Sequence, residues 1–114
     1  MKKIVILGST GSVGRNTLDV ISRYPDRFRV IGLAARQNMG LLAGQAKKFS
    51  PHYIGIGDEK KVKDFKKLYP WKRVKIGAGP EGLNYLAALR EADLVVVAMS
   101  GSIGLGPILH AIEA

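Results

Sequence analysis

The chain has 114 residues, of which 46% are hydrophobic and 24% charged, a balance typical of one globular domain. It contains no cysteine, which excludes a disulfide framework, a thiolate metal site and a cysteine nucleophile within these residues. The formal net charge of +9 favours anionic partners such as nucleic acid, acidic lipid or a phosphorylated small molecule. The first apolar run, "IVIL", is too short for a signal peptide or a membrane span. We therefore expect a cytoplasmic protein with no membrane partner.

Strand-like and helix-like patterns alternate along the chain. Short runs rich in β-branched residues predict five strands, at 2–7, 28–35, 53–56, 73–76 and 92–99. Between them, apolar positions recur with helical spacing: Val13, Thr17, Val20 or Ile21, and Tyr24; Leu42, Ala46 and Phe49; Val62, Phe65, Leu68 and Tyr69; Leu83, Leu86 and Leu89. Strands that are apolar on both faces and alternate with helices form a parallel sheet covered by helices. We expect an α/β fold of the doubly wound, Rossmann-type class, with helices on both faces and one domain over residues 1–114.

The segment 58–75, "DEKKVKDFKKLYPWKRVK", carries much of the positive charge. Its lysines fill the polar side of an amphipathic helix, and aromatic residues are not interleaved with them as single-strand binders require. We therefore favour a solvated helix face over a nucleic-acid patch, and we expect no nucleic-acid partner.

The segment 8–14, "GSTGSVG", connects the first strand to the first helix. A pyrophosphate binds backbone N–H groups at a helix N-terminus where no Cβ atom blocks its approach. In that role Gly8 turns the strand sharply, Gly11 admits the phosphate, and Gly14 lets the helix pack on the sheet. Further donors are the hydroxyls of Ser9, Thr10 and Ser12. The alternative is a glycine turn that binds nothing, but the strand–turn–helix context favours a phosphate site.

The end of the second strand distinguishes the two nicotinamide cofactors. An NAD site usually has Asp or Glu there to accept from the ribose 2′-hydroxyl, whereas residues 33–40 contain no carboxylate. Arg36 instead offers bidentate hydrogen bonds to a 2′-phosphate, with Gln37 and Asn38 as neutral donors beside it. The sequence therefore predicts NADPH as the cofactor.

A second glycine-rich turn follows the strand 92–99 at the same edge of the predicted sheet. Met99, Ser100 and Gly101 either line the ribose or nicotinamide there, or form an ordinary connection to a helix that begins at about Leu105. This helix ends at Ala114 without a terminal glycine, so the chain is expected to be cut before a catalytic domain.

Catalytic machinery is not recognisable in these residues. His52 and His110 have no carboxylate at helical ligand spacing, and Asp58 and Glu59 are typical of a helix start. No tyrosine is followed by lysine four residues later, as a short-chain dehydrogenase would require. We therefore predict no catalytic and no metal-binding residue.

The segment 6–21, "ILGSTGSVGRNTLDVI", resembles the N-terminus of the 1-deoxy-D-xylulose 5-phosphate reductoisomerase family, in which a Thr-Leu-Asp helix follows the glycine turn. "FRVIGLAARQN", "FSPHYIGIGDE" and "GLGPILHAI" are similar to later segments of that family in the same order. The resemblance implies an oxidoreductase that rearranges 1-deoxy-D-xylulose 5-phosphate and reduces it with NADPH to 2-C-methyl-D-erythritol 4-phosphate, in non-mevalonate isoprenoid biosynthesis. It also implies a sugar-phosphate substrate, a divalent metal (Mg or Mn) and a homodimer for the full-length enzyme.

The resemblance further implies which residues of this chain hold the cofactor. The pyrophosphate side would be held by Thr10, Gly11, Ser12 and Val13, and the 2′-phosphate side by Arg36, Gln37 and Asn38. Family members often have glycine and lysine at the positions of Arg36 and Gln37, so the basic charge is moved by one residue here. The chain ends before the family's metal carboxylates and substrate-phosphate site, so we expect cofactor binding without turnover.

Two other functions are compatible with the glycine turn. Phosphorylating semialdehyde dehydrogenases use the same glycine spacing with NADP, although the Thr-Leu-Asp helix argues against them. A non-catalytic nucleotide-sensing module is the second alternative.

Overall fold

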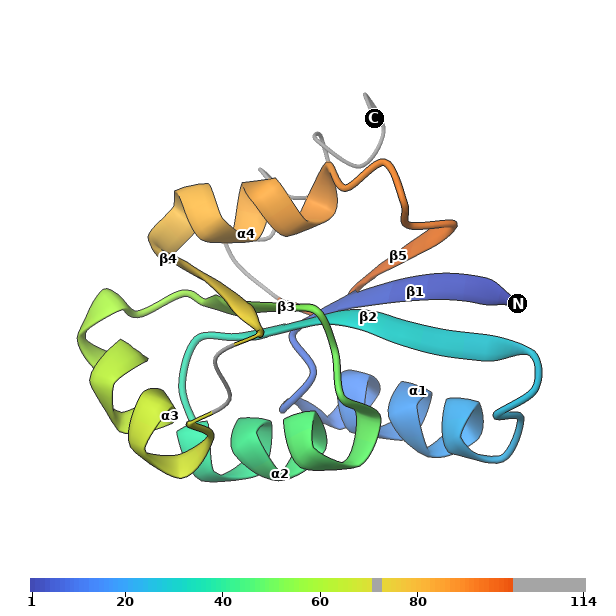
Figure 1. Cartoon of the computed structure of the whole chain (residues 1–114), viewed down its shortest axis with the longest axis horizontal. Coiled ribbons are helices and arrows are strands. Elements are labelled where there is room, and N and C mark those ends of the chain that lie inside the picture. Colours follow the sequence, from blue (N-terminus) through green and yellow to red (C-terminus); the bar gives the residue numbers. More distant parts are fainter. Residues whose placement is uncertain (71–72, 100–114) are drawn as a thin grey trace.

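The computed structural model describes residues 1–70 and 73–99. Within these ranges one parallel sheet is sandwiched between helical layers, with α1, α2 and α3 on one face and α4 on the other (Figure 1). The strands are β1 (Lys2–Leu7), β2 (Phe28–Ala35), β3 (Tyr53–Ile56), β4 (Lys75–Ala78) and β5 (Leu94–Val97). The helices are α1 (Ser12–Ser22), α2 (Met39–Phe49), the 3₁₀ turn η1 (Glu59–Lys61), α3 (Val62–Leu68) and α4 (Gly79–Ala87). The predicted α/β class, with a parallel sheet and helices on both faces, is confirmed.

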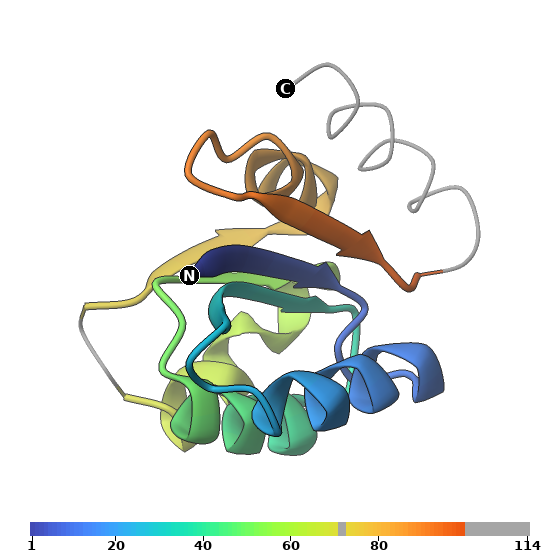
Figure 2. The ribbon, with the colours of Figure 1, turned by 90° about the vertical axis from the view of Figure 1, so that its right-hand side faces the viewer.

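The strand order in the sheet is β4-β3-β2-β1-β5, so β1 is central. The chain proceeds outward from β1 through β2 and β3 to β4, and then α4 returns it to the other side of β1. The strand order therefore reverses between β1 and β5, which is where open α/β sheets bind ligands. The carboxyl ends of β1, β2 and β5 lie at one edge of the sheet, beside the start of α1 (Figure 2).

The sheet separates two apolar cores. Ile4, Ile6 and Phe65 belong to the core beneath α1, α2 and α3, whereas Val5 and Leu83 belong to the core beneath α4. Each strand of the sheet centre is therefore buried on both faces, as its continuous apolar sequence requires. A bulge between β1 and β2 interrupts the alternation, because Ile4 pairs with Val30 while Val5 pairs with Gly32.

The fourth and fifth strands differ from their predicted bounds. β4 begins at Lys75 rather than at residue 73, and it ends at Ala78 rather than at residue 76, so it includes Gly77. A Cβ on Gly77 would lie 2.8 Å from the Cα of Gly82, so glycine is present because α4 packs closely against the strand. β5 covers Leu94–Val97 and is shorter than the predicted 92–99.

Part of the predicted apolar helix faces is wrong. Of the face predicted for the first helix, Val13 and Tyr24 are 58% and 45% exposed, and of the alternatives Val20 and Ile21 it is Ile21 that is buried. Leu18, which the pattern did not include, is buried as well. In α3, Leu68 is 45% exposed although the pattern placed it inward. The predicted helix from Leu105 lies outside the described residues. No helix in the described part of the chain is long and apolar enough to cross a membrane.

Candidate functional site

A cavity of about 530 Å³ opens at the carboxyl edge of the sheet, where the strand order reverses. Its size is within the range of small-molecule sites. Three chain segments line it, one after each of β1, β2 and β5: Gly8, Thr10 and Gly11; Ala35, Arg36, Gln37 and Asn38; Ala98 and Met99. The glycine turn and the "RQN" segment, which the sequence analysis connected only by their spacing, are thus two walls of one cavity.

Gly8 makes the sharp turn that the sequence analysis assigned to it. Its φ of +92° is in the region that favours glycine, and a Cβ there would lie 2.7 Å from Met99 Cγ and 2.8 Å from the carbonyl carbon of Ala98. The amides of Gly8 and Ser9 both donate to the Ala34 carbonyl of β2, at 2.7 and 2.9 Å. The turn is therefore fixed between its two neighbouring strands.

Gly14 and Gly11 have different surroundings. A Cβ on Gly14 would lie 2.1 Å from the Gly8 carbonyl oxygen and 2.7 Å from Ser9 Cα, so α1 packs directly on the turn. A Cβ on Gly11 would meet only the Gly8 carbonyl oxygen, at 3.7 Å. Internal packing therefore requires glycine at position 14 but not at position 11, where the space opens to the cavity.

The N-terminus of α1 faces this turn with its first amides lacking helical acceptors. Gly11 is the N-cap residue and has no side chain to bond them, and no acidic residue lies in the first turn. Ser12 and Val13 are exposed and Gly14 is buried. The amides and the helix dipole together favour an anion at this position.

Ser9 does not have the role predicted for its hydroxyl. The residue is fully buried beneath the turn, and its hydroxyl has no hydrogen-bond partner among the described residues. Its carbonyl accepts a hydrogen bond of 2.8 Å from Nε2 of Gln45, in α2. Gln45 was not singled out from the sequence, although a polar residue three positions after Leu42 on an inward helix face was a usable signal.

Arg36 is the one charged residue among the described residues that line the cavity. The side chain is exposed, and no hydrogen bond or ion pair joins its guanidinium to the described part of the chain. Its stem crosses Gly57, where a Cβ would lie 2.7 Å from Arg36 Cγ. The guanidinium is thus available to a ligand, while the stem is confined by Gly57, the residue that follows β3.

Asn38 has a structural role in the same wall. It adopts a left-handed conformation with φ of 62°, and its Oδ1 accepts a hydrogen bond of 3.3 Å from the Leu41 amide. Its side chain thus caps α2. Gln37 is exposed beside it. Of the three residues predicted to line the ribose or nicotinamide after the strand 92–99, Met99 lines the cavity. The other two, Ser100 and Gly101, lie outside the described residues.

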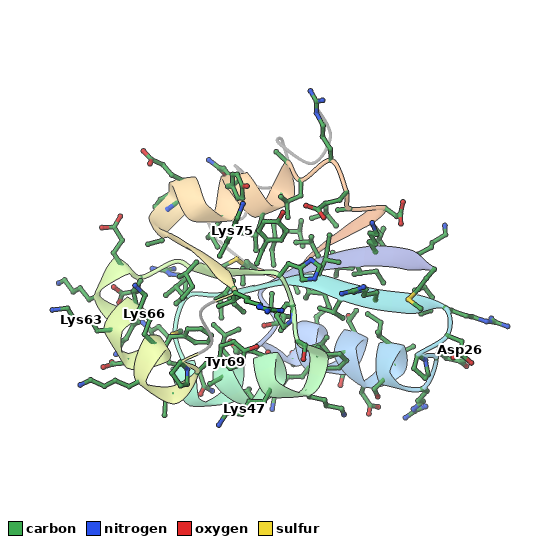
Figure 3. The ribbon with its side chains drawn as sticks, viewed as in Figure 1. Asp26, Lys47, Lys63, Lys66, Tyr69 and Lys75 are labelled. Carbon is green, nitrogen blue, oxygen red and sulfur yellow. The ribbon has the colours of Figure 1, made fainter. Side chains whose placement is uncertain are left out.

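The lysine-rich surface is separate from this cavity. Lys47 lies below α2, on the side away from the sheet, and Lys63 lies at the outer, left-hand side of α3 (Figure 3). The described residues that line the cavity include no lysine. This arrangement agrees with a solvated helix face. The described residues contain no group of three or more His, Asp or Glu side chains that could hold a metal ion.

A second polar cluster involves Tyr53, at the start of β3. Its hydroxyl donates to Glu91 Oε1 at 2.5 Å. This hydrogen bond, with partial burial and the Glu91 charge, raises the pKa of Tyr53 to about 12. Arg29 and His52 lie in contact nearby, with their nitrogens 3.1 Å apart. None of these residues lines the cavity.

Comparison with known proteins identifies the family. Residues 4–114 match the family model described as 1-deoxy-D-xylulose 5-phosphate reductoisomerase. The chain belongs to this family. The resemblance inferred from the glycine turn and the Thr-Leu-Asp helix is therefore confirmed, and the semialdehyde dehydrogenase alternative is not supported.

Relatives and solved structures agree with this assignment. The reductoisomerases of Thermodesulfovibrio yellowstonii and Protochlamydia amoebophila are 44% and 46% identical over 99% and 100% of this chain, which covers 29% of each. The Zymomonas mobilis reductoisomerase in complex with NADPH superposes with a TM-score of 0.91 at 36% identity, over 97% of this chain and 29% of that one. A reductoisomerase in complex with magnesium gives 0.89 at 30% identity, over 97% and 28%. The chain thus spans about 29% of the length of its curated relatives.

Proposed function

We propose that this chain is the NADPH-binding part of a 1-deoxy-D-xylulose 5-phosphate reductoisomerase. The observation that carries the proposal is a single cavity with an uncapped helix N-terminus on one wall and Arg36 on another. A dinucleotide phosphate has two anionic groups, the pyrophosphate and the 2′-phosphate, and the two walls offer a separate cationic or dipolar partner for each.

On the first wall, the pyrophosphate would accept hydrogen bonds from the amides of Ser12, Val13 and Gly14 and from the Thr10 hydroxyl. Gly11 supports this role because, among the described residues, a Cβ there would meet only the Gly8 carbonyl oxygen, at an ordinary contact distance of 3.7 Å. The helix dipole of α1 adds to the attraction, since no acidic side chain in the first turn competes for the same amides.

On the second wall, Arg36 and Gln37 would bind the 2′-phosphate, and Asn38 would shape the wall by capping α2. No carboxylate lines the described cavity, so the charged acceptor that an NAD site usually offers to the ribose 2′-hydroxyl is absent among these residues. The ribose and nicotinamide would lie toward Met99, on the third wall. The same role for Ser100 and Gly101 is a prediction from the sequence alone.

Bound NADPH supplies a hydride, and this chain binds and orients the cofactor. We assign the sugar-phosphate substrate, the rearrangement, the divalent metal and the homodimer contacts to the whole protein, which we expect in the cytoplasm. The 114 residues alone are expected to bind NADPH without turning over 1-deoxy-D-xylulose 5-phosphate.

Calorimetric titration with NADPH and NADH tests the proposal. We expect NADPH to bind more tightly than NADH, and Arg36→Ala to weaken NADPH binding by about 1.5–3 kcal/mol, roughly ten- to a hundredfold, with little effect on NADH. Arg90→Ala is the matched control, because it removes the same charge from an exposed residue outside the cavity. Equal affinity for both cofactors, or equal effects of the two substitutions, would contradict the 2′-phosphate assignment. Nucleic-acid binding with steep salt dependence, in place of NADPH binding, would contradict the whole proposal.

A further inference from the structure

Gln45 connects the middle of α2 to the glycine turn. Its Nε2 donates a hydrogen bond of 2.8 Å to the Ser9 carbonyl, and both residues are buried. Ser9 lies between Gly8 and Thr10, which both line the cavity, whereas Gln45 itself does not. The hydrogen bond from Gln45 therefore supports the cavity wall on the side that faces away from the cavity.

The Ser9 residue is held from two sides. Its amide donates to the Ala34 carbonyl at 2.9 Å, and its carbonyl accepts from Gln45. A buried carbonyl that loses its donor either moves or remains unsatisfied, and both are unfavourable. Removal of the Gln45 amide group would therefore loosen the turn at the point where it contacts the cavity.

The same helix carries part of the opposite wall. Asn38 caps the N-terminus of α2 through the Leu41 amide and also lines the cavity beside Arg36. Gln45 lies two turns further along this helix, which is a rigid connection. α2 thus holds the wall of Arg36 at its N-cap, Asn38, and the glycine turn at its middle.

We infer that Gln45 is a positioning residue that fixes the separation of the two walls of the cavity. This inference rests on the proposed NADPH site and adds to it a residue that does not touch the cofactor. A ligand that reaches both walls depends on their separation, whereas a ligand that contacts the wall of Arg36 alone does not.

Binding of two ligands to Gln45→Met tests the inference. Methionine has a similar length and no donor, and NADPH spans both walls while adenosine 2′-monophosphate contacts only the wall of Arg36. We expect the NADPH dissociation constant to rise about tenfold, the loss expected for one buried hydrogen bond, and that of adenosine 2′-monophosphate to change less than about twofold. Leu42→Met, a volume-conserving change at a buried position of the same helix, is the control and should leave both constants unchanged. Equal weakening of both ligands, or no weakening of NADPH, would overturn the inference.

Amide hydrogen exchange without ligand separates this inference from the proposed function. In Gln45→Met the Ser9 amide should exchange at least about tenfold faster than in Leu42→Met, because the turn opens locally. Gln45→Asn, which keeps the amide group but is one methylene shorter, should behave like Gln45→Met. Unchanged exchange in both variants would overturn the positioning role even if NADPH binds. Faster exchange in a chain that binds no NADPH would support the positioning role and refute the proposed cofactor site.

Discussion

Replacing Gly14 by alanine is expected to destabilise the fold where α1 meets the glycine turn. The new Cβ would lie 2.1 Å from the Gly8 carbonyl oxygen, 2.7 Å from Ser9 Cα and 2.9 Å from the Gly8 carbonyl carbon. All three atoms are backbone, so no side chain can rotate away, and α1 must retreat by about 1 Å or more to restore ordinary contacts. Such overpacking costs about 3 kcal/mol, which lowers the Tm of a domain of this size by roughly 10 °C or more.

Urea unfolding followed by circular dichroism measures this effect. Gly40→Ala is the matched control, because nothing lies within 4 Å of a Cβ at that position in α2, and it should change stability by less than about 1 kcal/mol. Gly11→Ala completes the series: its stability should stay near that of the wild type while its NADPH binding falls, since the new methyl group enters the cavity. If Gly14→Ala unfolds within about 0.5 kcal/mol of Gly40→Ala, the proposed contact between α1 and the turn is wrong.

Two further predictions concern Gly57 and Tyr53. Gly57→Ala should displace the stem of Arg36, because a Cβ there would lie 2.7 Å from Arg36 Cγ. Titration calorimetry should show that Gly57→Ala weakens NADPH binding, and that the double variant with Arg36→Ala loses less binding free energy than the sum of the two single losses. A double-variant loss equal to that sum would contradict the contact. The hydrogen bond to Glu91 raises the pKa of Tyr53 to about 12, so the folded state favours the protonated phenol. The resulting stabilisation of the folded state is present below pH 10 and is lost as the pH rises toward 12. The unfolding midpoints of Tyr53→Phe and the wild type should therefore differ at pH 9 and converge by pH 12. A difference that stays constant with pH would show that the hydrogen bond between Tyr53 and Glu91 does not stabilise the fold.

The fold class could be predicted because each strand and helix carries its own periodic signal. Two walls of the cavity were predictable for a similar reason. The glycines of 8–14 and the basic "RQN" segment each follow a strand, and parallel strands bring their carboxyl ends to one edge. Sequence order alone therefore placed Gly8 and Arg36 near each other without knowledge of any contact.

Two of the errors, in α1 and in β4, involve glycine, which has no hydrophobic signal. The inward face of α1 runs through Gly14, Leu18 and Ile21, but the pattern that starts at Val13 and repeats at Val20 has equally good helical spacing. The predicted strand 73–76 stopped before Gly77, although this glycine continues β4 and allows α4 to approach the sheet. The contacts of Gln45 with Ser9 and of Gly57 with Arg36 could not be predicted because the partners are distant in the sequence, although the polar Gln45 on an inward helix face was a usable signal.

The packing of Met99 and Ala98 against Gly8 has a consequence for the order of events during synthesis. The glycine turn follows β1 directly, but β1 pairs with β5, whose residues emerge from the ribosome ninety positions later. Contacts between such distant segments form late in folding. A growing chain can therefore complete the proposed cofactor cavity only after residue 99 has been added, although residues 8–11 and 35–38, which form its other two walls, are made much earlier.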